Sequence, residues 1–197
     1  MIVSVVVIFS CKKATDKKQL VETKLLTIKN IEVVKELLVL NGIQGVWYYK
    51  TQRFSGYAVK YYSNNTLKEK VGFYNGKKEG KAQKWFEDGV LKMEYHYHQN
   101  KLVSDYRFWW SNGILASEVT YVDGEKEGVE KKWFNTGVLS KKRNLVNGRE
   151  EGIQQAWLQN GKMYVNYEAK NGRIFGMKRA NSCYRLEDEL IIRRKKQ

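Results

Sequence analysis

The amino-acid sequence repeats with a period of 24 residues, and this period restricts the possible folds more than any other feature. Glycine or serine recurs at this interval over 56–176, and no insertion or deletion breaks the register. The positions are Gly56, Gly80, Ser104, Gly128, Gly152 and Gly176. An aromatic column with the same interval consists of Tyr61, Trp85, Trp109, Trp133 and Trp157. A fixed period of this size is typical of repeat proteins, in which each unit is stabilised by its neighbours.

The unit at 80–103 predicts a β-hairpin. Its first strand is expected over 81–86 and its second over 91–97, with Glu87-Asp88-Gly89 between them. Asp and Gly favour a turn, because Asp hydrogen-bonds to its own backbone and Gly adopts positive φ. A second turn follows at 99–100, where most other units have Asn-Gly or Asp-Gly, the pairs that most strongly indicate a hairpin.

These units predict an all-β fold, with a single elongated antiparallel meander sheet, or solenoid, of five 24-residue β-hairpin repeats over 56–176. Strands in a sheet lie about 4.8 Å apart, so each two-stranded unit should lengthen the sheet by roughly 10 Å.

Apolar columns are expected on both faces of this sheet, because neighbours in a strand point to opposite faces. The residue after each member of the aromatic column is also large and apolar. These residues are Tyr62, Phe86, Trp110, Phe134 and Leu158. We interpret most aromatic residues as structural, since cross-strand pairs of this kind stabilise sheets. The alternative is that tryptophans also form a ligand-binding face. The candidates are Trp85, Trp109, Trp110, Trp133 and Trp157.

Two fragments of the unit resemble a known family. Tyr74-Asn-Gly-Lys-Lys-Glu-Gly80 and Trp85-Phe-Glu-Asp-Gly-Val-Leu91 are similar to the bacterial variant of the MORN repeat, and the resemblance extends over 42–176. It implies a β-hairpin repeat protein that acts as an interaction or scaffold module, at membranes in some members and at the bacterial envelope in many. One subgroup is labelled as antitoxins of toxin–antitoxin systems. The resemblance implies no catalytic residue.

The N-terminal segment resembles a targeting sequence. Residues 1–10 are apolar and are followed by Cys11 and two lysines, as at the end of a bacterial lipoprotein signal peptide. Cys11 would then be lipidated and would tether the protein to the envelope. The expected location is the outer membrane, with the protein facing the periplasm. The alternative is a buried N-terminal strand in a cytoplasmic protein.

The remaining segments flank the repeats. Residues 11–19 are interpreted as a linker, and 20–55 as an N-terminal cap that contains one or two strands before residue 41. Residues 177–197 are interpreted as a C-terminal cap and basic tail. Terminal units of repeat proteins are atypical because they cover an exposed sheet edge.

The net charge is +15 and is spread along the chain. One interpretation is a solvated, lysine-rich sheet that resists aggregation through its edges. The other is attraction to an anionic partner: lipid head groups, an acidic glycan or an acidic protein. Nucleic acid is not expected, because the N-terminal segment directs the chain out of the cytoplasm and no nucleic-acid-binding motif is present.

The sequence contains no pattern that predicts catalysis. His96 and His98 alternate along one strand and would need a third ligand to bind a metal, so we interpret them as surface or half-buried side chains. The glycines recur in turns and form no phosphate-binding loop. The two cysteines cannot make a disulfide framework, and Cys183 is interpreted as a small buried side chain. We therefore expect no enzyme, no cofactor and no metal site.

Three functions remain compatible with the sequence. The first is an envelope-tethered scaffold that binds a protein or an anionic polymer or membrane surface. The second is a neutraliser of a toxin partner. The third is glycan binding by stacking on the tryptophan column.

Overall fold

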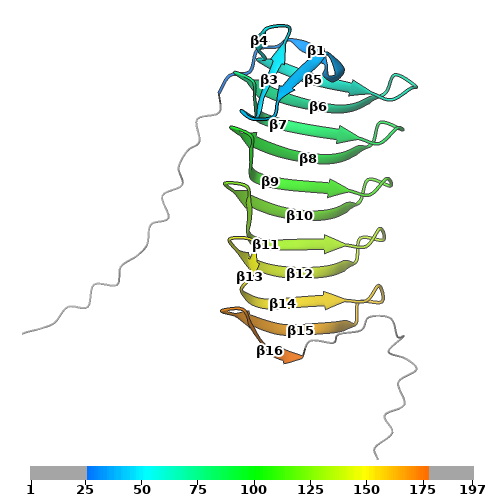
Figure 1. Ribbon diagram of the computed structural model, residues 1–197. Helices are drawn as coiled ribbons and strands as arrows, with labels where there is room; N and C mark the ends of the chain where they lie inside the picture. The colour runs from blue at the N-terminus through cyan, green and yellow to red at the C-terminus, as the bar shows by residue number, and fades with distance from the viewer. Residues whose placement is uncertain (1–25, 178–197) are drawn as a thin grey trace, which may run out of the picture.

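The computed structural model describes residues 26–177, so Cys11, the segments at 1–10 and 11–19, and Cys183 lie outside the described residues. Its main element is a thirteen-stranded sheet in which the strands from β5 to β16 stack in chain order (Figure 1). The repeat strands are β5 (Gly56–Tyr61), β6 (Leu67–Tyr74), β7 (Lys77–Trp85), β8 (Leu91–His98), β9 (Lys101–Trp109), β10 (Leu115–Val122), β11 (Glu125–Trp133), β12 (Leu139–Val146), β13 (Arg149–Glu150), β14 (Gly152–Trp157), β15 (Met163–Lys170) and β16 (Arg173–Met177). The all-β meander predicted from the sequence is confirmed.

The turns at one edge of the sheet have the geometry expected of Asn-Gly hairpins. Asn75 and Gly76 both have positive φ, at 50° and 79°, as a type I′ turn requires. The turns at the opposite edge have three residues and end in the left-handed conformation, with Gly89 at φ 86°. Asn65 occupies this position in the first unit at φ 64°, because Asn tolerates the left-handed region better than other non-glycine residues.

The N-terminal segment departs from a simple antiparallel meander. β1 (Glu32–Val34) pairs parallel to β5 and covers the edge of that strand. The short 3₁₀ helix η1 (Lys35–Leu37) then leads into a separate three-stranded sheet. Its strands are β2 (Leu38–Asn41), β3 (Val46–Tyr49) and β4 (Gln52–Arg53). The expectation of a single sheet therefore holds for the repeats but not for this segment, which we call the cap.

The cap packs on one face of the large sheet, and we call this the cap face. Val33, Leu38 and Phe54 belong to a buried cluster with residues of β5 to β8. The sheet residues of this cluster are Ala58, Val71, Phe73, Ala82 and Tyr95. Four of these residues start a row that continues across the repeats, the central row. It consists of Ala58, Val71, Ala82, Tyr95, Tyr106, Val119, Glu130, Arg143, Gln154 and Tyr167.

The opposite face, the outer face, carries charged residues of alternating sign over much of its length. Its middle row contains Gln83, Glu94, Arg107, Glu118, Lys131, Lys142 and Gln155. Glu94 pairs with Lys81 at 3.0 Å, and Glu118 pairs with Lys131 at 3.1 Å. Solvated ion pairs of this kind keep a sheet face soluble and contribute little to stability.

Contacts between aromatic rings lie on the cap face rather than along the tryptophan column. Tyr95 stacks on Tyr106 with ring centroids 5.5 Å apart, and Tyr106 contacts Tyr121 at 5.7 Å. Within residues 26–177, no ring contact joins the tryptophans of the 24-residue column to one another. Copies of this column are two strands apart, roughly 10 Å, with Leu91 directly opposite Trp85. The indoles of the column therefore do not stack on one another, and each packs between its cross-strand neighbours.

Backbone hydrogen bonds link the turns of successive units. The Gly124 N–H donates to the Leu102 carbonyl at 2.8 Å, and the N–H groups of Gly76, Asn100 and Gly148 make equivalent bonds. One turn has Asn100 where the others have Gly. Its Nδ2 donates to the Gly45 carbonyl and its Oδ1 accepts from the Lys78 N–H, both at 2.8 Å. This turn therefore fastens the repeats to the cap.

Candidate binding surface

The cap covers only the first strands of the cap face. The buried cluster reaches Tyr95 in β8, and Tyr106 in β9 packs at its margin. No described element lies over the cap face from β9 to β15 (Figure 1). We call this uncovered part the open face. Sheets normally bury one face against another layer, so the open face is the first candidate for an interaction surface.

The open face changes in character along its length. Its first strands carry aromatic side chains, and Phe108 contacts Trp110 with ring centroids 5.9 Å apart. Two strands later the central row becomes polar, because Glu130 occupies the column that contains Ala82 and Tyr106. The surface therefore has an aromatic end near the cap and a charged end over β11–β15.

A network of charged side chains is built into the charged end. Glu130 is only 2% exposed, and its Oε1 accepts from Lys126 Nζ at 2.7 Å while its Oε2 accepts from Arg143 Nε at 2.6 Å. Arg143 Nη1 also lies 3.6 Å from Glu150 Oε1. The Tyr167 hydroxyl donates to Glu150 Oε2 at 2.7 Å. The buried carboxylate is thus fully paired, as burial of a charge requires.

These contacts determine the protonation states. Burial alone would raise the pKa of the Glu130 carboxyl, but hydrogen bonds from Lys126 and Arg143, together with their charges, lower this pKa below its ordinary value. Burial and the hydrogen bond to Glu150 raise the pKa of Tyr167 to about 12. At neutral pH, Glu130 is therefore ionised and Tyr167 keeps the proton that it donates.

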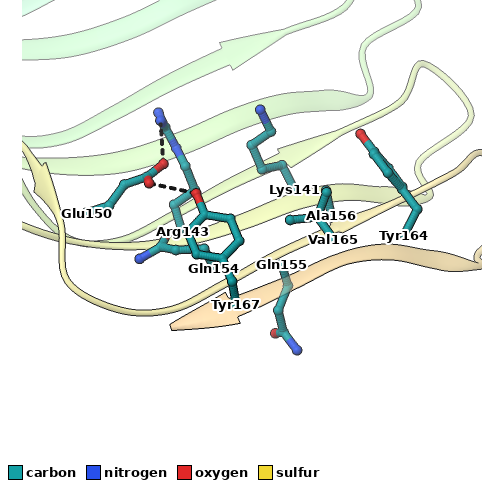
Figure 2. A pocket seen from close by; sticks show the side chains of 9 residues that line it. All are labelled: Lys141, Arg143, Glu150, Gln154, Gln155, Ala156, Tyr164, Val165 and Tyr167. Carbon is teal, nitrogen blue, oxygen red and sulfur yellow. Dashed lines mark hydrogen bonds and ion pairs between the residues drawn. The ribbon is translucent and has the colours of Figure 1, made fainter. Parts of the chain in front are cut away.

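The network borders a pocket of 240 Å³ on the open face (Figure 2). Lys141, Arg143, Tyr164 and Tyr167 lie on the same side of the sheet, whereas Gln155 points to the other side (Figure 2). The complete lining is Lys141, Arg143, Glu150, Gln154, Gln155, Ala156, Tyr164, Val165 and Tyr167. The pocket therefore combines cations, hydrogen-bond donors and a small apolar wall.

Two lysines face each other directly on the open face. Lys132 of β11 and Lys141 of β12 are register partners, and like charges in this position destabilise a sheet. Within residues 26–177, no salt bridge joins either lysine to a carboxylate. Burial lowers the pKa of Lys132, and the charges of Arg143, Lys126 and Lys141 lower it further, although Glu130 opposes them. The site thus has surplus positive charge that an anionic ligand would neutralise.

The five candidate tryptophans do not form one surface. Lys84 lies on the cap face, where it contacts Glu69 beneath the cap at 3.3 Å, so its neighbour Trp85 lies on the outer face. The same alternation places Trp109, Trp133 and Trp157 there. Trp110 contacts Phe108 on the cap face instead. It is 37% exposed, and its Nε1 donates to the Trp133 carbonyl at 3.2 Å. Whether any of the five binds a ligand stays a prediction.

The residues that form the charged end were absent from the sequence-based candidates. Lys126, Glu130 and Arg143 lie on the face opposite to the tryptophan column, and no motif marks them. A signal was nevertheless present, because Glu130 breaks a 24-residue column that starts with alanine at 58 and 82. A charge in a repeat column that begins with apolar residues indicates either a functional site or a paired buried charge.

The two histidines are not brought together with further metal ligands. His98 Nδ1 lies 3.1 Å from Glu79 Oε1, a carboxylate that is 0% exposed, and the Gln99 N–H donates to Glu79 Oε2 at 3.0 Å. His96 Nδ1 is buried without a hydrogen-bond partner. In the part of the chain that the structure describes, no three His, Cys, Asp or Glu side chains are grouped to hold a metal ion.

Comparison with protein families finds the MORN repeat variant at two adjacent repeats. The matched residues are 78–99 and 102–123, which cover most of β7 to β10. MORN repeats generally mediate binding to proteins or membranes, and they are scaffold modules rather than catalytic ones. Comparison with curated proteins finds no match. Over residues 26–177, no helix has the length and apolar character needed to cross a membrane.

Proposed function

We propose that this chain is a non-catalytic repeat scaffold that binds a partner protein through the open face, at the bacterial cell envelope. The observation that carries the proposal is the direct opposition of Lys132 and Lys141, neither of which forms a salt bridge within residues 26–177, on a sheet face that no described element covers. The match of two repeats to an interaction module supports it.

The partner surface should be acidic with aliphatic or aromatic contacts around it. Lys132, Lys141 and Arg143 provide positive charge at one end of the open face, and Tyr106, Phe108 and Tyr121 provide aromatic area at the other. Aromatic and Arg anchors are typical of protein interfaces. The carboxylates of the charged end are hydrogen-bonded to basic side chains or a tyrosine, which suits a structural role better than proton transfer.

An envelope location rests on the N-terminal segment. We propose that Cys11 is lipidated and tethers the repeat sheet to the membrane. Palmitate should label the wild-type chain and not the Cys11→Ser variant in the native host. Equal labelling of the two chains, or no label on either, would remove the tether from the proposal.

The binding proposal is tested with two neighbouring lysines on opposite faces. Lys141→Glu reverses a charge on the open face, and Lys142→Glu reverses one on the outer face of the same strand. Wild type and Lys142→Glu should capture the same protein from envelope extracts, and Lys141→Glu should not. Equal capture by both variants would refute the role of the open face.

The captured protein also decides between the functional alternatives. A toxin that is inhibited on binding would make the chain a neutraliser that uses the same surface. A glycan that binds Lys141→Glu normally, but not the outer-face variants Trp109→Ala and Trp133→Ala, would instead support stacking on the tryptophan column.

A further inference from the structure

The charged end of the open face holds more cations than carboxylates. Its positive side chains are Lys126, Lys132, Lys141 and Arg143, and its carboxylates are Glu130 and Glu150. Glu130 is already shared by Lys126 and Arg143. Lys132 and Lys141 therefore repel each other across one rung of the sheet, and carboxylates supplied from outside the sheet would relieve this repulsion.

The pocket beside these lysines defines what else the ligand must contain. Ala156, Val165 and Tyr164 form part of its wall, next to Lys141. An occupant with carboxylates and adjoining aliphatic side chains would fit this wall, whereas a small anion alone would leave it exposed. The matching chemistry is a short acidic peptide segment with apolar flanks.

The chain itself contains such a segment. Residues 186–192 read Leu-Glu-Asp-Glu-Leu-Ile-Ile, and Glu187, Asp188 and Glu189 are the only acidic residues of the printed sequence after β16. Aliphatic residues stand on both sides of this acidic triplet. Its carboxylates complement Lys132 and Lys141, whereas Arg143 already pairs with Glu130 and Glu150.

The distances allow the segment to reach this surface. β16 ends at Met177, which pairs with Asn166 in β15. β12 is three strands away from β16, in the order β16-β15-β14-β12. Three strand spacings are about 14 Å, whereas the nine residues from 178 to 186 can span roughly 30 Å when extended.

We propose that residues 186–192 dock on the charged end of the open face, with the acidic triplet over Lys132 and Lys141 and the aliphatic residues in the adjoining pocket. The cap covers the first strands of the same face, so the chain would cover its sheet from both ends. The docking proposal rests on the proposed function, because both concern the open face. The docked segment would compete with the partner protein for this surface.

The test uses a nitroxide spin label on Cys183 in the full-length Cys11→Ser chain, with backbone amide signals recorded by NMR. Docking should broaden amide signals of β12, β14 and β15 and leave β7 and β8 sharp. The broadening should disappear when Glu187, Asp188 and Glu189 are all changed to Lys. It should also recede in 1 M salt, where the screening length falls to about 3 Å.

Two substitutions on opposite faces of β12, and one combination that restores opposite charges, distinguish docking from a general effect of the substitutions. Lys141→Glu should abolish the broadening, and Lys142→Glu should leave it intact. Combining the triple lysine segment with Lys132→Glu and Lys141→Glu should restore it. Each variant should first show the wild-type amide dispersion when no label is attached.

Two results would overturn the proposal. One is broadening of β12–β15 that does not change in the triple lysine chain. The other is broadening seen only when a labelled chain is mixed with an isotope-labelled chain without nitroxide, because the segment would then dock on a second copy. No partner protein is present, so these outcomes are independent of whether the open face binds one.

Discussion

Replacing Glu130 by Ala tests the charged network most directly. Glu130 is 2% exposed and holds Lys126 at 2.7 Å and Arg143 Nε at 2.6 Å. The substitution removes the carboxylate and leaves two cations close together on the cap face. Alanine is compatible with this position of the repeat, because it occupies the same column at 58 and 82.

The size of the effect follows from the exposure of the partners. Breaking a fully buried ion pair costs about 3–5 kcal/mol. Lys126 and Arg143 retain side-chain exposures of 33% and 27%, and Arg143 keeps Glu150 at 3.6 Å, so water and Glu150 replace part of the lost interaction. We expect the variant to be less stable by about 2–3 kcal/mol at neutral pH, since hydrogen bonds to charged groups contribute roughly 1.5–3 kcal/mol each.

The pH dependence of this difference has a defined sign. The folded-state pKa of Glu130 is lowered, so the carboxylate contributes stability above its unfolded pKa of about 4.3. This contribution is lost as the pH falls through the lower folded pKa. The difference between wild type and Glu130→Ala should therefore be constant near neutral pH and shrink below about pH 4.

The measurement combines urea unfolding with hydrogen exchange, because repeat proteins need not unfold in one step. Glu118→Ala is the control, since Glu118 forms one half-exposed ion pair with Lys131 on the outer face, and such pairs contribute about 0–1 kcal/mol. Faster exchange in Glu130→Ala should be largest in β11 and β12. An equal loss in the two variants, or a difference that persists undiminished in acid, would refute the role assigned to the network.

Three further substitutions test the turns and the contacts between units. Gly76→Ala should lower the thermal unfolding temperature much more than the control Gly148→Ala. A Cβ at Gly76 would lie 2.4 Å from a side-chain atom of Val46 in the cap, whereas a Cβ at Gly148, which also has positive φ, would have nothing within 4 Å. Glu79→Ala should cost about 1.5–3 kcal/mol in urea unfolding, because a fully buried carboxylate bonds a backbone N–H. Trp110→Phe keeps an aromatic side chain but removes the indole N–H that donates to the Trp133 carbonyl, so a loss of at least about 0.5–1.5 kcal/mol is expected. Stability unchanged in any of these variants would contradict the contact concerned.

The repeated hairpins could be predicted because local rules determine them. Asn-Gly pairs specify two-residue turns, and Asn65 can replace glycine in the first unit, at φ 64°, because Asn tolerates the left-handed region. Alternation along a strand also placed the Trp85 and Phe86 columns on opposite faces. These inferences need only neighbours in the sequence.

The cap and the charged network could not be predicted in the same way. β1 has three residues and pairs parallel to β5, and so short a strand has no distinctive pattern. The network depends on a column that changes from Ala82 to Glu130, and on register shifts such as that between Glu118 and Thr120, where β10 pairs with β11. Such bulges alter which side chains share a face. Burial of Glu130 therefore depends on its side-chain contacts with Lys126 and Arg143, which no turn motif or apolar pattern in the sequence indicates.

Asn100 has a consequence for how this chain can change over evolutionary time. Tandem copies usually exchange, multiply or disappear by recombination, since any copy can replace another. The copy that contains Asn100 is different, because the side-chain amide of this residue donates a hydrogen bond to the Gly45 carbonyl. At another place in the array, that amide would lose its acceptor. A copy with glycine in place of Asn100 would not restore the hydrogen bond to the cap. Growth or loss of units should therefore be confined to copies beyond this one, so members of different length should share their first units and vary in their last.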